Sequence, residues 1–106
     1  MAHYTIETSG PRCYVATTGD LTASMVPELK AALQGALTRG AQELVVDLGQ
    51  AAALDSSGIG LLIAAHNSLS QKQGKLRVIN VSEDILQLMQ SLRLVHRFSI
   101  TGRPNP

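Results

Sequence analysis

Residues 44–60 read LVVDLGQAAALDSSGIG, and this stretch decides the fold class. Leu44 to Leu48 form a short apolar run interrupted only by Asp47, which is typical of a strand buried on both faces. The Asp-Ser-Ser-Gly that follows places residues that favour helix caps directly before an apolar, periodic segment. The stretch therefore predicts a buried strand that leads through a loop into a helix.

The segments on either side continue this alternation of strands and helices. The predicted elements are strands at 3–8 and 13–18, a helix ending at Gly40, the strand at 44–48, a helix at about 57–71, a strand at 76–80, a helix after Ser82 and a short strand at 98–100. The first two strands form a hairpin, and the helical crossovers predict parallel pairing with right-handed connections. We expect an α/β fold in which a mixed sheet of four to five strands packs against helices.

Local signals at two of the helices give finer predictions. Ser24 is expected to cap the first helix, with Pro27 in its first turn, and Ser82 is expected to cap the third. The inner stripe of the third helix is expected to be Ile85, Leu88, Met89 and Leu92.

The length and composition indicate one domain. A chain of 106 residues can bury a single core, and 44% hydrophobic residues are enough to form it. We expect this domain to span residues 1–106, with its core at about 4–100 and a tail at 101–106 that has no reason to be ordered.

Charge and hydropathy disfavour several classes of partner. The net charge is +1 and no run of Lys or Arg occurs, so nucleic acid is not an expected partner. No apolar stretch approaches the roughly 20 residues of a membrane span, and the N-terminus carries no signal peptide. We therefore expect a cytoplasmic protein with no membrane contact, which is a monomer when free.

The cysteine and histidine residues indicate no metal or cofactor. The single cysteine, Cys13, excludes an internal disulfide and a cysteine zinc site, and its apolar neighbours predict a small buried hydrophobe. His3, His66 and His96 share no spacing typical of metal ligands.

The helix predicted at 57–71 has two distinct surfaces. At about 100° per residue, its core face is expected to contain Ile59, Leu62, Ile63, His66 and Leu69. His66 is best explained as a half-buried imidazole. The opposite face carries no charge and contains Leu61, Ala64, Ala65 and Ser68. The helix propensity of alanine explains part of this face, and docking of a partner explains Leu61 as well, so both interpretations stay open.

The motif LDSSGIG at 54–60 admits four interpretations: a helix cap, a catalytic nucleophile, a phosphate-binding loop and a hydroxyl that is modified. A nucleophile elbow needs glycine two residues on either side of the serine, which neither Ser56 nor Ser57 has. Gly58 and Gly60 are present, but the Lys-Ser/Thr ending of a phosphate-binding loop is absent. Taken alone, the motif is best explained as a cap, and no enzymatic activity is expected.

The position of the motif favours a regulatory role in addition to capping. It follows the carboxyl end of a parallel strand, which is the edge where α/β proteins bind ligands and partners. A helix N-terminus also tolerates negative charge, and a phosphoserine adds about −1.5 to −2 charges at neutral pH. A phosphate on the motif could block a partner without unfolding the domain.

Longer stretches of the chain resemble a known family. DSSGIG at 55–60, after LVVDL at 44–48 and before QGKLRV at 73–78, is similar to the STAS domain of bacterial anti-sigma factor antagonists. GDLT at 19–22, and Ser82 before a helix that ends near 92–94, agree with this family as well. The similarity covers about residues 4 to 100.

The resemblance implies a phosphorylation switch at Ser56, the hydroxyl residue directly after the motif aspartate. An anti-sigma factor that is also a serine kinase would bind the unphosphorylated domain and phosphorylate Ser56, and a PP2C-type phosphatase would restore binding. Asp55 and Ser57 would support the site, and Gly58 would let the partner approach closely. The family often has aspartate at the position of Thr22, so this loop departs from its pattern. The residues expected to bind the partner are Asp20, Thr22, Gly60, Leu61, Ala64 and Ala65.

A second function is compatible with the same resemblance. STAS domains also serve as subunits of transporters and lipid-trafficking complexes. In that case Ser56 and Ser57 would only cap the helix, and the face containing Leu61 would be a constitutive interface.

Overall fold

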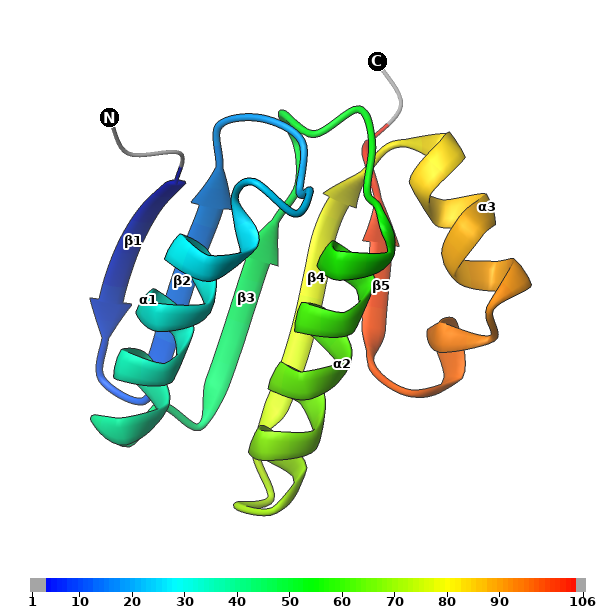
Figure 1. Ribbon diagram of the computed structural model, residues 1–106. Helices are drawn as coiled ribbons and strands as arrows, with labels where there is room; N and C mark the ends of the chain where they lie inside the picture. Colours follow the sequence, from blue (N-terminus) through cyan, green and yellow to red (C-terminus); the bar gives the residue numbers. More distant parts are fainter. Residues whose placement is uncertain (1–3, 105–106) are drawn as a thin grey trace.

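The computed structural model describes residues 4–104, in which strands and helices alternate in the expected order (Figure 1). The elements are β1 (Tyr4–Ser9), β2 (Arg12–Thr17), α1 (Val26–Thr38), β3 (Glu43–Asp47), α2 (Ser56–Ser70), β4 (Lys75–Val81), α3 (Glu83–Ser91), a 3-10 turn (Leu94–His96) and β5 (Ser99–Gly102). His3, which was predicted to begin the first strand, lies outside the described residues.

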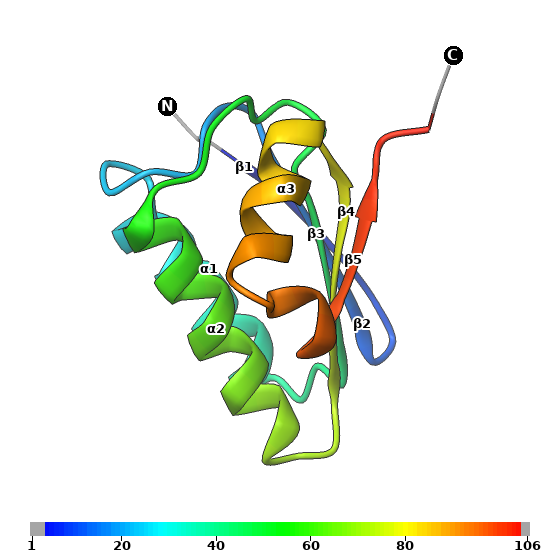
Figure 2. The same ribbon diagram turned by 90° about the vertical axis from the view of Figure 1, so that its right-hand side faces the viewer.

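The five strands form one mixed sheet in the order β1-β2-β3-β4-β5. β1 pairs antiparallel with β2, and every other neighbouring pair is parallel. Each crossover places the next strand beside the previous one, always in the same direction across the sheet. Since right-handed crossovers in one direction place their helices on one face, α1, α2 and α3 all lie on the same side (Figure 2). The α/β prediction of a mixed sheet packed against helices is confirmed.

The core lies between the helices and the inward-facing residues of the sheet. Cys13 and Leu44 lie in one row across the strands, and Val15, Val46 and Val78 lie in the next. All five are fully buried. Cys13 is thus a buried hydrophobe as predicted, and burial raises the pKa of its thiol. In residues 4–104, no helix is long and apolar enough to cross a membrane.

None of the helices in the described part of the chain covers the other face of the sheet, yet Val45 on this face is only 5% exposed. Tyr14 and Arg77 flank it in register, so their long side chains lie beside it. The prediction that β3 is buried on both faces therefore holds at Val45, although neighbouring side chains and not a second helix layer surround it.

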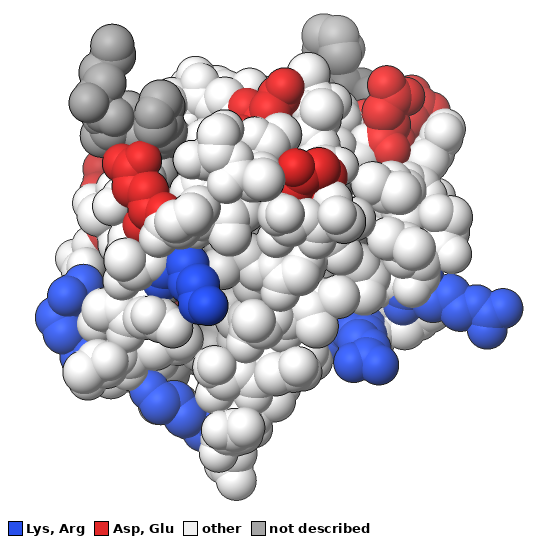
Figure 3. Space-filling model, viewed as in Figure 1, with Lys and Arg blue, Asp and Glu red and all other residues white. Residues whose placement is uncertain are grey.

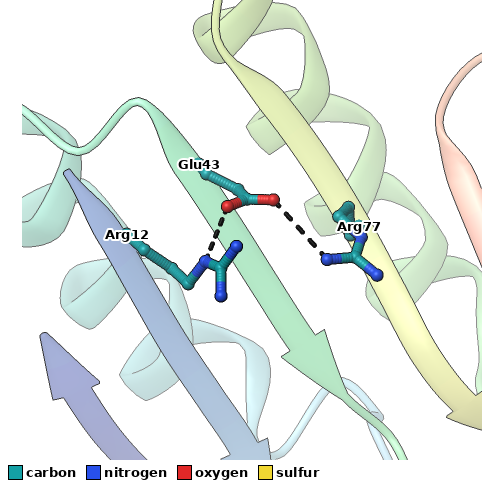
Figure 4. Close-up of polar contacts among 3 residues, drawn as sticks. All are labelled: Arg12, Glu43 and Arg77. Carbon is teal, nitrogen blue, oxygen red and sulfur yellow. Dashed lines mark hydrogen bonds and ion pairs between the residues drawn. The ribbon is translucent and has the colours of Figure 1, made fainter. Parts of the chain in front are cut away.

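Three charged residues bridge the strands on this face (Figure 4). Arg12 donates a hydrogen bond to Glu43 at 2.6 Å, and Arg77 forms an ion pair with the same carboxylate at 3.6 Å. The Arg12 hydrogen bond is the main cause of the lowered pKa of Glu43. Because the groups are solvent-exposed, these pairs contribute little stability and serve mainly to favour the strand register.

Tyr14 and Asp47 form a polar pair at the end of β3. The Tyr14 hydroxyl donates to one carboxylate oxygen of Asp47, and the Gly49 N–H donates to the other at 2.8 Å. Burial alone would raise the pKa of Asp47, but these donors, together with Asn80 and the charge of Arg103, lower it overall. The hydrogen bond to Asp47 in turn raises the pKa of Tyr14 to about 12.

The start of α1 differs from the sequence prediction. Ser24 does not cap this helix: the N-cap position is Met25, which makes no side-chain cap bond. The N–H groups of Met25 and Val26 instead donate to the Thr22 carbonyl at 2.9 and 3.1 Å. A backbone turn thus satisfies these donors, and the Ser24 hydroxyl pairs with that of Thr22 at 3.2 Å. Pro27 lies in the first turn as predicted.

The third helix begins as predicted and ends earlier than predicted. The Ser82 hydroxyl accepts a hydrogen bond from the Ile85 N–H at 3.2 Å, which confirms the cap. Leu92, however, is not part of the inner stripe, because it is 47% exposed. The helix has ended at Ser91, and the positive φ of Arg93 turns the chain away.

The predicted tail begins too early in the sequence. Thr101 and Gly102 belong to β5, which pairs with β4. Arg103 is also placed by contacts, because its side chain donates to backbone carbonyls of Gly49 and Ala51 at 2.8 and 3.0 Å. Only residues 105–106 of the expected tail lie outside the described residues.

Replacing Asp47 by Asn should lower the pKa of the Tyr14 phenol from about 12 toward its ordinary value of 10.0. The carboxylate that favours the neutral phenol would be gone. Ultraviolet titration in a Tyr4→Phe background observes this phenol alone.

Tyr14→Phe should reduce the free energy of unfolding by about 1 kcal/mol below pH 10. The difference in the free energy of unfolding between wild type and Tyr14→Phe should vanish as the pH rises through 12. In the titration, a Tyr14 pKa that is unchanged by Asp47→Asn would contradict the assigned hydrogen bond.

Candidate functional site

Two loops lie side by side at the carboxyl ends of the parallel strands. One, residues 18–25, connects β2 to α1, and the other, residues 48–55, connects β3 to α2. The Leu21 N–H donates to the Ala53 carbonyl at 3.2 Å, and the Asp55 N–H donates to the Leu21 carbonyl at 3.3 Å. These bonds join the loops by a short parallel bridge directly before the helix that carries the motif.

Asp20 connects the same two loops through its side chain. One carboxylate oxygen accepts from the Ala52 and Ala53 N–H groups at 2.7 and 3.1 Å. Asp20 was predicted only as a contact for a partner, so sequence reasoning missed this internal role. Its position in a polar GDLT loop gave no signal of which backbone groups it would meet.

Asp55 caps α2, as the sequence predicted for this motif. One oxygen accepts from the Gly58 N–H at 2.9 Å, and the other accepts from the Ala23 N–H at 3.0 Å. The carboxylate thus satisfies the helix N-terminus and binds the neighbouring loop at the same time. These two backbone donors, in this order, are the main causes of the lowered pKa of Asp55.

Ser56 is the first residue of α2, and its side chain is exposed. Within residues 4–104, its hydroxyl makes no hydrogen bond, and neither does that of Ser57. Support by Ser57 therefore comes through its backbone N–H toward Asp55. With Asp55 as the cap, the helix begins at Ser56, one residue earlier than predicted.

Among residues 4–104, no side chain is placed to act as a general base for the Ser56 hydroxyl. Asp55 is occupied by backbone N–H groups. The His66 ring lies ten residues further along α2, or about 15 Å, and contacts Phe98 with ring centroids 5.5 Å apart. In the described part of the chain, no three His, Cys, Asp or Glu side chains are grouped to hold a metal. The arrangement presents a hydroxyl without activating it.

The two glycines near the start of α2 have opposite surroundings. A Cβ added to Gly58 would lie 2.4 Å from the Leu21 carbonyl oxygen and 2.6 Å from a methyl carbon of Leu54. The close approach at Gly58 is therefore to the chain itself, which corrects the expectation that it serves a partner. A Cβ added to Gly60 would meet nothing within 4 Å.

The face of α2 predicted to bind a partner is only partly exposed. Leu61 and Ala65 are each 5% exposed, because α1 packs against this side of α2. The two side chains lie in a small hollow between α1 and α2, so the prediction that they form an exposed face is wrong. Ser56, Gly60 and Ala64 remain exposed, and their spacing of four residues places them in one line along the helix.

The edge of the sheet around Ser56 is acidic. Figure 3 shows the visible carboxylates in the upper half of this view and the Lys and Arg side chains mainly in its lower half. The carboxylates that lie in the loops or begin the helices at this edge are Asp20, Glu28, Asp55, Glu83 and Asp84. A shallow hollow beside the motif is lined by Gly19, Asp20, Thr22, Ser24 and Met25. A partner that docks here meets hydroxyls and carboxylates next to Ser56.

Gly58→Ala should lower the free energy of unfolding by about 1–3 kcal/mol, because the new methyl group would overlap a backbone oxygen. Gly60→Ala, two residues further on, should raise it by up to about 1 kcal/mol through helix propensity. Denaturant melts of the two variants measure both changes. An unchanged free energy of unfolding in Gly58→Ala would show that the loop at Leu21 can move away from the new methyl group.

Asp55→Ala should lower the denaturation midpoint more than Ser56→Ala, because only Asp55 accepts bonds from backbone N–H groups. The lowered pKa of Asp55 means that the cap acts fully above its ordinary value of 3.8 and weakens as the pH falls through the folded-state value. The difference in denaturation midpoint between wild type and Asp55→Ala should therefore become smaller in acid. The reverse order of the two variants would assign the cap to Ser56.

Comparisons with known proteins agree with this geometry. A family model described as "Mlab, STAS domain" matches residues 4–101. An anti-sigma-B factor antagonist from Staphylococcus epidermidis is 32% identical over 84 residues, which cover 79% of this chain and 69% of that protein. The antagonist from Listeria monocytogenes is 31% identical over 84 residues, and the match spans 66% of its length, slightly less than two thirds.

Solved structures share the fold at lower sequence identity. SpoIIAA in its unphosphorylated form superposes with a TM-score of 0.77 at 18% identity, covering 96% of this chain and 89% of SpoIIAA. The phosphorylated form of SpoIIAA from Bacillus gives 0.76 at 20% identity, covering 92% and 89%. An anti-sigma factor antagonist from Mycobacterium paratuberculosis gives 0.81 at 20% identity, covering 92% and 83%.

The strand order, the helix start at Asp55 and Ser56, and the match over nearly the whole chain lead to one assignment. The chain belongs to the STAS domain family, among the anti-sigma factor antagonists.

Proposed function

We propose that the protein is an antagonist controlled by phosphorylation of Ser56. The unphosphorylated form binds an anti-sigma factor that is also a serine kinase, phosphate on Ser56 ends this binding, and a PP2C-type phosphatase restores it. The observation that carries the proposal is the exposed hydroxyl at the first position of α2, which makes no hydrogen bond within residues 4–104 and lies beside a cap supplied by the neighbouring Asp55. The protein acts by binding and not by catalysis.

The local geometry supports access by a kinase. A kinase must bring the hydroxyl to the terminal phosphate of ATP, and the Ser56 side chain can leave the surface without breaking a hydrogen bond within residues 4–104. Because Asp55 supplies the cap, phosphorylation at Ser56 leaves the start of the helix in place.

The charges of this edge support direct blocking of the partner. The segments that leave the carboxyl ends of β2 to β5 contain a single Lys or Arg, Arg103, and its guanidinium is bound to backbone carbonyls. A phosphate on Ser56 therefore has no cation in these segments that would fold it back onto the domain. It adds about −1.5 to −2 charges to an already acidic surface, which repels acidic groups and resists desolvation in an interface.

The docking surface that we propose has two parts. One is the exposed line of Ser56, Gly60 and Ala64, where the absence of large side chains lets a partner come close to the helix. The other is the hollow that contains Asp20 and Thr22. The relatives that bear the name anti-sigma-B factor antagonist support an anti-sigma factor as the partner.

A second candidate is a constitutive subunit of a transporter or lipid-trafficking complex. The description of the matching family model, "Mlab, STAS domain", does not name an antagonist, so the family match alone leaves this candidate open. In this case Ser56 receives no phosphate, and a negative charge at this position changes no regulated step.

Incubation with the cognate kinase and Mg-ATP should add one phosphate to the wild type, measured by intact mass, and none to Ser56→Ala. Ser57→Ala is the matched control, and it should still be phosphorylated. The Ser57 hydroxyl is adjacent to that of Ser56 and likewise makes no hydrogen bond to the described residues. Ser56→Asp should weaken kinase binding at least about tenfold in calorimetry, because the added carboxylate repels acidic groups of the partner and resists desolvation in the interface. Its melting profile should be unchanged.

Two results would count against the switch. Phosphate gained equally by Ser56→Ala would place the modified residue elsewhere. A wild type that stays unmodified while it binds its partner with the same affinity as Ser56→Asp would favour the constitutive subunit.

A further inference from the structure

Arg103 reaches from the end of β5 to the loop that precedes the motif. Its guanidinium donates to the carbonyls of Gly49 and Ala51 at 2.8 and 3.0 Å, and its Nε donates to the Asn80 carbonyl at 3.1 Å. Its own N–H donates to the Val81 carbonyl at 3.1 Å. One side chain near the end of the chain thus connects the end of β4 to the β3–α2 loop.

The β3–α2 loop depends on such side-chain contacts. It has neither helical nor sheet bonding along most of its length, so its polar backbone groups need other partners. Asp20 accepts from its N–H groups at Ala52 and Ala53. Arg103 satisfies acceptors of the same loop, because it donates to the carbonyls of Gly49 and Ala51. An anion and a cation therefore hold the loop from two directions.

The loop leads directly to the phosphorylation site proposed above. Only four residues separate Ala51, which Arg103 binds, from the first residue of α2. Between them lie Asp55, which caps the helix, and Leu54, which packs against Gly58. A shift of the loop carbonyls would move the Asp55 cap relative to α2 and would therefore change the direction of the Ser56 hydroxyl.

We propose that Arg103 is a positioning residue for the modification of Ser56: by binding the carbonyls of the β3–α2 loop, it sets the orientation in which Ser56 meets its kinase. The proposal rests on the proposed function, because it concerns the same phosphorylation. It adds that the residue directly after β5, which contacts neither the Ser56 hydroxyl nor the cap, controls how well the site is used.

The chemistry of this contact requires arginine and not merely a positive charge. The guanidinium presents several N–H donors in a rigid plane, so it can reach carbonyls of two segments at once. A lysine ammonium carries a similar charge near Asp47 but cannot reproduce this planar arrangement. Arg103→Lys therefore separates the charge from the geometry.

Lys72 offers a matched control at the opposite end of α2. Its Nζ donates to the Leu37 carbonyl at 2.6 Å, so Lys72→Ala also removes an exposed cation bound to a backbone carbonyl. This contact joins the ends of α1 and α2, away from the loop. Its loss should leave the proposed site unchanged.

The first measurement is amide hydrogen exchange, which needs no kinase. In Arg103→Ala, the N–H groups of Ala52, Ala53 and Gly58 should exchange about tenfold faster than in wild type. Arg103→Lys should show an intermediate effect, and Lys72→Ala should show none. Unchanged exchange in both Arg103 variants would show that the loop does not need this contact and would overturn the proposal.

The second measurement is the steady-state kinetics of phosphorylation by the cognate kinase. Arg103→Ala should lower kcat about tenfold with little change in KM, because the docking surface remains while the hydroxyl is misoriented. A merely structural role would leave kcat of the folded variant unchanged. Arg103→Lys should restore kcat only in part, and Lys72→Ala should match wild type.

The two measurements separate the failure of each proposal. Faster exchange with wild-type kcat would show that the loop is held by Arg103 but does not orient Ser56, which overturns the positioning role alone. A wild type that accepts no phosphate would overturn the proposed function and the positioning role together. The exchange rates would then still decide whether Arg103 holds the loop.

Discussion

The β3–α2 loop must carry the chain from the end of a buried strand to the start of a helix with little regular hydrogen bonding of its own. Its backbone donors and acceptors are satisfied partly by backbone groups of neighbouring segments and partly by charged side chains. Asp20 and Asp47 accept from its N–H groups, and Arg103 donates to its carbonyls. These residues lie at or beyond the ends of β2, β3 and β5, so the contacts from Asp20 and Arg103 form only when segments far apart in the sequence have come together.

The order of this loop allows one motif to cap a helix and to present a hydroxyl. Asp55 accepts from both Gly58 and Ala23, which leaves the Ser56 hydroxyl without a structural task. The absent side chain of Gly58 lets the helix start pack directly on the Leu21 carbonyl. Capping and regulation do not compete, because adjacent residues perform them.

Local patterns predicted most of the fold and the helix start at which the motif lies. The continuous apolar run of β3 and the caps at Asp55 and Ser82 are encoded within a few residues, and each is observed. Ser24 failed as a cap because a backbone turn at Thr22 had already satisfied the donors. Leu92 failed as a core residue because periodicity does not reveal where a short helix stops.

The sequence by itself determined the order of elements, the mixed sheet with its parallel crossovers and the position of the Asp-Ser-Ser-Gly motif at the start of α2. Only the tertiary structure decided which residues around that motif face solvent. Leu61 and Ala65 look exposed on a helix taken alone, but α1 buries them. Arg103 looks like part of a tail, yet it binds a loop that lies far from it in the sequence. Helix and strand periodicities are local properties, whereas burial and side-chain contacts depend on segments that meet only after folding.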